Sequence, residues 1–163
     1  MKIKMLMLCL LIGASTKVFA EYPIIYMHGK PVSCTASNGQ TVLFYDNPAA
    51  AQAARQMGGA RADFTQQFGY TIALDPSFMN SLPFLGAIFS AYHECAHVAL
   101  PMGVGLGSPS QERNADCYAA QAMKAHGYIK SWKDFNEAMS AIIVSGGGHA
   151  MSAQRINAIK QCL

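Results

Sequence analysis

The chain has 163 residues and a formal net charge of +3, and 52% of its residues are hydrophobic while 13% are charged. This composition excludes an intrinsically disordered chain, which would be poor in hydrophobic residues and rich in charge, and the length is that of one domain. The basic excess comes from residues 1–20, whereas acidic and basic residues balance from Glu21 onward. We therefore expect no nucleic-acid partner.

The N-terminal segment has the layout of a secretory signal peptide. Two lysines precede the apolar run from Met5 to Ile12, and Val18 and Ala20 stand at the −3 and −1 positions of a cut after Ala20. The run is shorter than the roughly 20 residues that span a bilayer. We expect residues 1–20 to be removed and 21–163 to form a single exported domain, periplasmic or secreted, without a stable membrane anchor.

The order of the predicted elements is that of an α+β fold, with N-terminal strands followed by a helical half. Three segments have strand composition, with an Asn-Gly turn signal before the second: 23–28, 41–45 and 68–74. Five segments carry helix periodicity or end signals: 48–57, 84–100, 110–126, 131–144 and 150–162. Ser81 is the expected cap before the second helix, and Ser110 is the expected cap of the third.

Four cysteines remain after the predicted cleavage: Cys34, Cys95, Cys117 and Cys162. In an oxidising compartment an even number favours two disulfides over metal ligation. Three pairings are possible, and the sequence does not decide between them. We prefer Cys95–Cys117 with Cys34–Cys162, because the first bridge would join two helices that the motifs below bring together.

An H-E-x-x-H motif, His93 to His97, lies inside the predicted helix 84–100. Residues i and i+4 of a helix lie about 40° apart around the axis and about 6 Å apart along it. Two imidazoles so placed can bind one zinc ion. Glu94 is turned by about 100° from His93, so it lies beside the metal without binding it and can accept a proton from the attacking water.

A second motif, E-x-x-A-D, supplies the third ligand that a catalytic zinc needs. Glu112 and Asp116 lie one turn apart near the start of the next predicted helix, and the Gly/Pro-rich loop 101–109 lets the chain reverse between the two helices. Glu112 would point at the two histidines. Asp116 would accept the free N–H of a histidine and fix its tautomer.

The two motifs together resemble the gluzincin metallopeptidases, in particular the branch of CAAX prenyl proteases and periplasmic quality-control proteases. The resemblance covers roughly residues 84–120 and implies a minimal zincin-like metallopeptidase domain. We expect its substrates to be peptides or unfolded proteins. It implies that His93, His97 and Glu112 bind Zn²⁺, that Glu94 is the general base, and that Asp116 orients a histidine.

A further donor usually stabilises the oxyanion in such a reaction. His149 is our first choice, because the three preceding glycines could bring it over the site. Arg155, Tyr92 and Tyr118 are the other candidates, and Arg155 could instead be an ion-pair partner.

Two alternatives stay open at this point. Residues 70–74 could form an edge strand that pairs with extended substrate, or an ordinary core strand. The chain could also be a zinc-containing binding module or pseudo-peptidase without catalysis, if a fourth protein ligand closed the metal site.

Overall fold

The computed structural model describes residues 21–101, 104, 107–145 and 152–163 and has an α+β fold. The predicted signal peptide therefore lies outside the described residues. The elements are, in chain order, β1 (Glu21–Tyr22), β2 (Ile25–Met27), β3 (Lys30–Val32), β4 (Leu43–Tyr45), α1 (Pro48–Gln56), β5 (Ala60–Thr65), β6 (Gly69–Leu74), α2 (Pro76–Ser81), α3 (Phe84–Ala99), α4 (Pro109–Ala125), α5 (Trp132–Ser145) and α6 (Ala153–Lys160).

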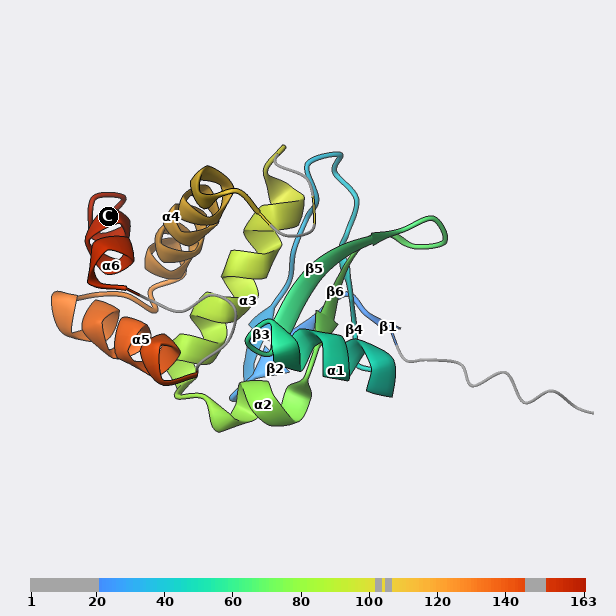
Figure 1. The fold of residues 1–163 in the computed structure, drawn as a ribbon, viewed down its shortest axis with the longest axis horizontal. Helices are drawn as coiled ribbons and strands as arrows, with labels where there is room; N and C mark the ends of the chain where they lie inside the picture. Colours follow the sequence, from blue (N-terminus) through green and yellow to red (C-terminus); the bar gives the residue numbers. More distant parts are fainter. Residues whose placement is uncertain (1–20, 102–103, 105–106, 146–151) are drawn as a thin grey trace, which may run out of the picture.

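The main sheet has four strands in the order β1-β4-β6-β5, and β2 and β3 form a separate two-stranded sheet (Figure 1). β6 is parallel to β4 and antiparallel to β5. The segment 70–74 is thus an interior strand, paired on both sides, so of our two alternatives the core strand is the one that the structure shows and the edge strand is wrong. The edge strands of this sheet are β1 and β5, and we predicted neither.

α3 is the central helix of the fold. From Leu85 to Val98 every residue except Ser90 is buried. One side of α3 packs on β5 and β6, and α4 and α5 pack on the other; Figure 1 shows it running between the sheet and the group of α4, α5 and α6. A helix that is buried on all sides can hold polar side chains only if they have partners.

The two faces of the sheet are covered by different helices. Ile72 and Leu74 belong to the core that contains α3, whereas Ala73 packs with Ala50 and Ala54 of α1. This alternation is the period-2 pattern of a strand that is buried on both faces. Each residue of β5 can therefore be assigned to the α3 side or the α1 side.

Side-chain caps set the starts of the helices. The Asn47 carboxamide accepts the Ala50 N–H at the start of α1. Ser108, not Ser110, caps α4 in a capping box with Gln111. Ser81 caps no helix; it is the last residue of α2, and Pro83 precedes α3 without a side-chain cap. None of the described helices is long and apolar enough to cross a membrane.

The cysteines pair as Cys34–Cys95 and Cys117–Cys162, with Cα–Cα distances of 5.6 and 5.4 Å. Our preferred pairing is wrong for a geometric reason. Cys95 lies two residues after His93, about 200° around the helix. When the histidines of α3 face α4, Cys95 must therefore point away from α4, toward the segment that carries Cys34. The two bridges fasten α3 and α4 to other parts of the chain rather than to each other.

Asp75 joins α1 to α2, and we expect its charge to stabilise the fold. Its side chain is buried, accepts the Phe78 N–H at the start of α2, and accepts a hydrogen bond from Nε of Arg55 at 2.5 Å. The Arg55 guanidinium, helped by the Phe78 N–H, holds the pKa of Asp75 below its usual value although burial raises it.

Asp75→Asn should therefore lower the free energy of unfolding at pH 7 by about 1 kcal/mol. A carboxyl with a lowered folded-state pKa stabilises the protein above its unfolded pKa, about 3.9, and loses that contribution as the pH falls through the folded value. Urea unfolding should show a difference at pH 7 that shrinks below pH about 4. Asp46→Asn, at an exposed position, is the control. A difference of the same size at both pH values would contradict the ion-pair explanation.

Candidate metal centre

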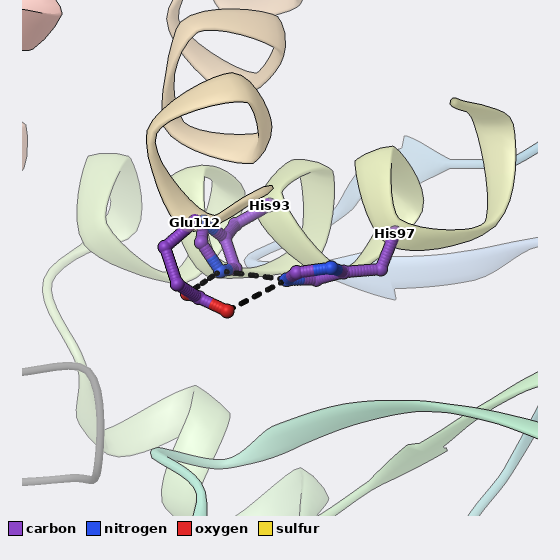
Figure 2. Close-up of side chains that lie close together, drawn as sticks. All are labelled: His93, His97 and Glu112. Atoms are coloured by element: carbon purple, nitrogen blue, oxygen red, sulfur yellow. Dashed lines mark hydrogen bonds and ion pairs between the residues drawn. The ribbon is translucent and has the colours of Figure 1, made fainter. Parts of the chain in front are cut away.

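Two imidazoles project from the same face of α3. His93 and His97 are 4% and 3% exposed, and their Nε2 atoms are 3.3 Å apart (Figure 2). They are one helical turn apart, as the motif predicts. Both rings therefore present one nitrogen to the same point.

Glu112 completes the group from the neighbouring helix. Its position in the first turn of α4 is set by the cap at Ser108, and Figure 2 shows its carboxyl group lying against both imidazoles. Oε2 is 3.2 Å from Nε2 of His93, and Oε1 is 3.5 Å from Nε2 of His97. The structure thus brings together the three residues that the sequence predicts as ligands, and they could hold a metal ion.

The donor atoms of the three residues lie close enough together to surround one metal ion. Bonds of about 2.0–2.1 Å to two vertices of a tetrahedron place those vertices about 3.3–3.4 Å apart. Nε2 of His93 lies 3.3 Å from Nε2 of His97 and 3.2 Å from Oε2 of Glu112, whereas Nε2 of His97 approaches the other carboxylate oxygen, Oε1, at 3.5 Å. With one donor atom from each residue, the three atoms all lie within 4.8 Å of one another. Two imidazole nitrogens and one carboxylate are also a ligand set that zinc prefers.

Asp116 fixes the orientation of His93. Its Oδ1 atom accepts the Nδ1–H of His93 at 2.9 Å, and it is 1% exposed. With the proton on Nδ1, Nε2 keeps its lone pair for a metal. Arg155 of α6 donates two hydrogen bonds to the same carboxylate, Nε to Oδ2 at 2.5 Å and Nη2 to Oδ1 at 2.7 Å.

The charges around His93 favour a cation at this place. Burial alone lowers the pKa of His93, but its hydrogen bonds to Asp116 and Glu112 and the charge of Glu94 raise it to about 9. Burial raises the pKa of Asp116, but Arg155 and His93 bring it below its usual value. A divalent ion carries the same kind of charge as the proton that this environment retains, and it would replace that proton.

Glu94 points to a different partner. Its Oε2 atom accepts the N–H of Ala62 on β5 at 2.7 Å, and the residue is 6% exposed. The contact joins α3 to the edge strand. Glu94 is not one of the three residues that could hold a metal ion, which are His93, His97 and Glu112.

The candidates for the oxyanion donor have different positions. His149 lies outside the described residues. Tyr92 is buried and stacks on His126 with ring centroids 5.6 Å apart, so its ring is engaged with that histidine. Tyr118 is partly buried against the core. Arg155 forms the ion pair that was one of our two interpretations, and its Nη2 lies 3.9 Å from Oε2 of Glu112.

Two contacts of the site were not predicted. The Ala62 N–H is a backbone group, so only the course of β5 reveals it. Gly107 lies against the Glu112 carboxyl group, and a Cβ at this position would overlap Oε1. The only signal in the sequence was the glycine itself, just before the Ser108-Pro109 start of the helix.

Gly107→Ala should therefore weaken metal binding without unfolding the protein. The added methyl group would push the Glu112 carboxyl group out of line with the histidines. We expect the zinc affinity to fall by about 10- to 100-fold, as for other residues that position ligands. Competition with a chromophoric chelator measures it, and Ser110→Ala, an exposed change in the first turn of α4, is the control. An unchanged affinity would show that Glu112 can adapt or is not a ligand.

Comparisons with protein families, with curated proteins and with solved structures found no match to this chain.

Proposed function

We propose that this chain is an exported zinc metallopeptidase that cleaves peptides or unfolded proteins. The observation that carries the proposal is the arrangement of four buried or half-buried side chains, of which three could bind a metal ion and one could act as a base. His93, His97 and Glu112 present three donors to one point, while the Glu94 carboxylate is held next to them by the Ala62 N–H. Three protein donors leave one position of a tetrahedral zinc for water or substrate.

The proposed reaction is hydrolysis of an amide bond. Zinc bound by the three donors would polarise the substrate carbonyl and lower the pKa of a water molecule. Glu94 removes a proton from the attacking water, whose oxygen bonds to the carbonyl carbon. The carbon–nitrogen bond then breaks, and Glu94 passes the proton to the leaving amine. Asp116 keeps the proton of His93 on Nδ1 throughout.

The proposed substrate position is along β5. A peptide in extended conformation can add to the edge of a sheet through backbone hydrogen bonds. Among the described strands none pairs with the outer edge of β5, and Ala62 on that strand contacts Glu94. A strand added there would pass close to the proposed general base. This assigns to β5 the role that we had considered for residues 70–74.

Metal content and cleavage test the proposal together. The purified protein should bind about one zinc per chain and cleave an unfolded protein such as reduced casein, and a chelator should abolish the cleavage. His93→Ala should lose both zinc and cleavage, whereas His126→Ala, an exposed histidine near the end of α4, should keep both. Zinc binding without any chelator-sensitive cleavage would refute the peptidase and favour the binding module.

We also propose that the protein is exported, and its two cysteine pairs support this location. Export would expose the chain to an oxidising compartment, where the pairs Cys34–Cys95 and Cys117–Cys162 can form. The signal peptide itself stays a prediction, and N-terminal sequencing of the exported protein should find Glu21 as the first residue.

A further inference from the structure

The α3 side of β5 carries an aromatic side chain that the fold does not bury. Phe64 follows Ala62 by two residues, so both side chains lie on the same side of the strand. Ala62 is 3% exposed, whereas Phe64 is 53% exposed. A large apolar side chain at an exposed edge is a feature that proteins usually avoid unless it contacts a partner.

Pairing with β6 identifies this side of the strand. Ala62 is opposite Ile72, and both belong to the core that contains α3. Phe64 is opposite Tyr70, one step further along the same side. The two rings contact each other edge to face, with centroids 5.2 Å apart and planes at 69°. They form an aromatic pair at the end of the face that α3 covers.

The position of Phe64 relative to the proposed general base follows from the geometry of the strand. Glu94 accepts the Ala62 N–H, which fixes the position of its carboxylate along β5. Two residues of an extended strand span about 6.5–7 Å. Phe64 is therefore one side-chain step away from the point where Glu94 touches the strand.

A strand added to β5 would bring its own side chains into register with this pattern. In an antiparallel strand every second residue directs its backbone groups to the same edge. The outward N–H groups of Ala62 and Phe64 donate to Oε2 of Glu94 and Oδ1 of Asp63, so an added strand would pair with the outward carbonyl groups of these residues. Side chains of an added strand alternate in the same way, so one would lie beside Ala62 and the next on that side would lie beside Phe64. Ala62 presents a methyl group to the first side chain, and Phe64 presents an aromatic ring to the second.

We propose that Phe64 and Tyr70 form a subsite for a large apolar side chain, aromatic or aliphatic, of an extended peptide substrate. The side chain belongs to the substrate residue two positions from the one beside Ala62. This inference rests on the proposed peptidase function and adds a specificity to it. Aromatic rings offer such a side chain both apolar area and edge-to-face contacts.

The test is cleavage of matched peptides by the zinc-loaded protein. An unbiased peptide library first locates the cleaved bond and the preferred position. Two fluorogenic peptides are then compared that differ only there, one with Phe and one with Ala. The wild-type protein should prefer the Phe peptide by about tenfold or more in kcat/KM, mainly through a lower KM.

Variants of the subsite decide the inference. Phe64→Ala should reduce the Phe-to-Ala preference to within about twofold, and Phe64→Leu should retain most of it because the side chain stays large and apolar. The matched control is Tyr26→Ala, which removes another exposed aromatic side chain, 67% exposed, from the separate sheet. Because Phe64 is exposed, none of these changes should unfold the protein.

The outcomes separate the inference from the proposed function. If chelator-sensitive cleavage persists and Phe64→Ala keeps the wild-type preference, the subsite is wrong and the peptidase stands. A wild-type preference for Ala or for a charged side chain at this position would also overturn the subsite. If the wild-type protein shows no chelator-sensitive cleavage, both the subsite and the peptidase are wrong.

Discussion

Glu94→Gln should lower kcat/KM for peptide cleavage by at least about 100-fold and leave zinc binding unchanged. Removal of a general base typically costs 10²- to 10⁴-fold. Glutamine has nearly the same shape, and its carbonyl oxygen can still accept the Ala62 N–H that the carboxylate accepts at 2.7 Å. The variant therefore keeps the contact between α3 and β5 and loses only the ability to take a proton from water.

The measurement needs metal content and kinetics on the same preparation. Zinc per chain should equal that of the wild type, because Glu94 is not in the group His93, His97 and Glu112. Glu137→Gln, an exposed change on α5, is the matched control and should keep full activity. Cleavage at the wild-type rate by the Gln variant would show that another group accepts the proton. Loss of zinc would show that Glu94 is itself a ligand.

The parts of the site that a sequence can predict are those set by local helix geometry. The spacing of His93 and His97 places them on one face whatever the rest of the chain does. Glu112 needed one non-local assumption, a chain reversal between two helices, and the loop composition supported it. The structure brings these three residues together, and it places Asp116 against His93 as expected.

The parts that a sequence does not predict depend on distant partners. β5 has two alanines and two charged residues in six positions, so its composition is not that of a strand. It is a strand because it pairs with β6 along its whole length. Our predicted disulfide pairing was wrong for a related reason. We chose the partners because two helices were expected to lie close together, and we did not consider which face of its helix Cys95 occupies.

Arg155 illustrates the same limit within the site. It comes from the last helix, 39 residues after its partner Asp116, and no spacing rule connects the two. α6 is held on α4 by the Cys117–Cys162 bridge and by the buried side chain of Ile159. Only this docking turns a basic residue of a short helix into the partner of the carboxylate that orients His93.

Asp116→Asn should lower the zinc affinity by about 10- to 100-fold, because an amide cannot serve both of its neighbours. Oδ1 of the carboxylate accepts from Nδ1 of His93 and from Nη2 of Arg155, and Oδ2 accepts from Nε of Arg155. An amide has one oxygen, and arginine can only donate, so an NH₂ group at the Oδ1 or the Oδ2 position faces a donor. If the oxygen takes the Oδ2 position, the NH₂ group faces Nδ1 of His93, which must then give up its proton. The proton moves to Nε2, and the nitrogen that should bind the metal is blocked.

A double variant tests whether the loss of zinc affinity comes from the tautomer of His93. When Arg155 is replaced by Leu, the amide oxygen is free to turn toward His93 and restore the correct tautomer. Asp116→Asn with Arg155→Leu should therefore bind zinc more tightly than Asp116→Asn alone, although each single change weakens binding. Chelator competition measures the affinities, and ¹⁵N chemical shifts of the His93 ring report the position of the proton. Asp46→Asn is the control at an exposed position. Additive losses in the double variant would mean that Asp116 acts through its charge rather than through the tautomer of His93.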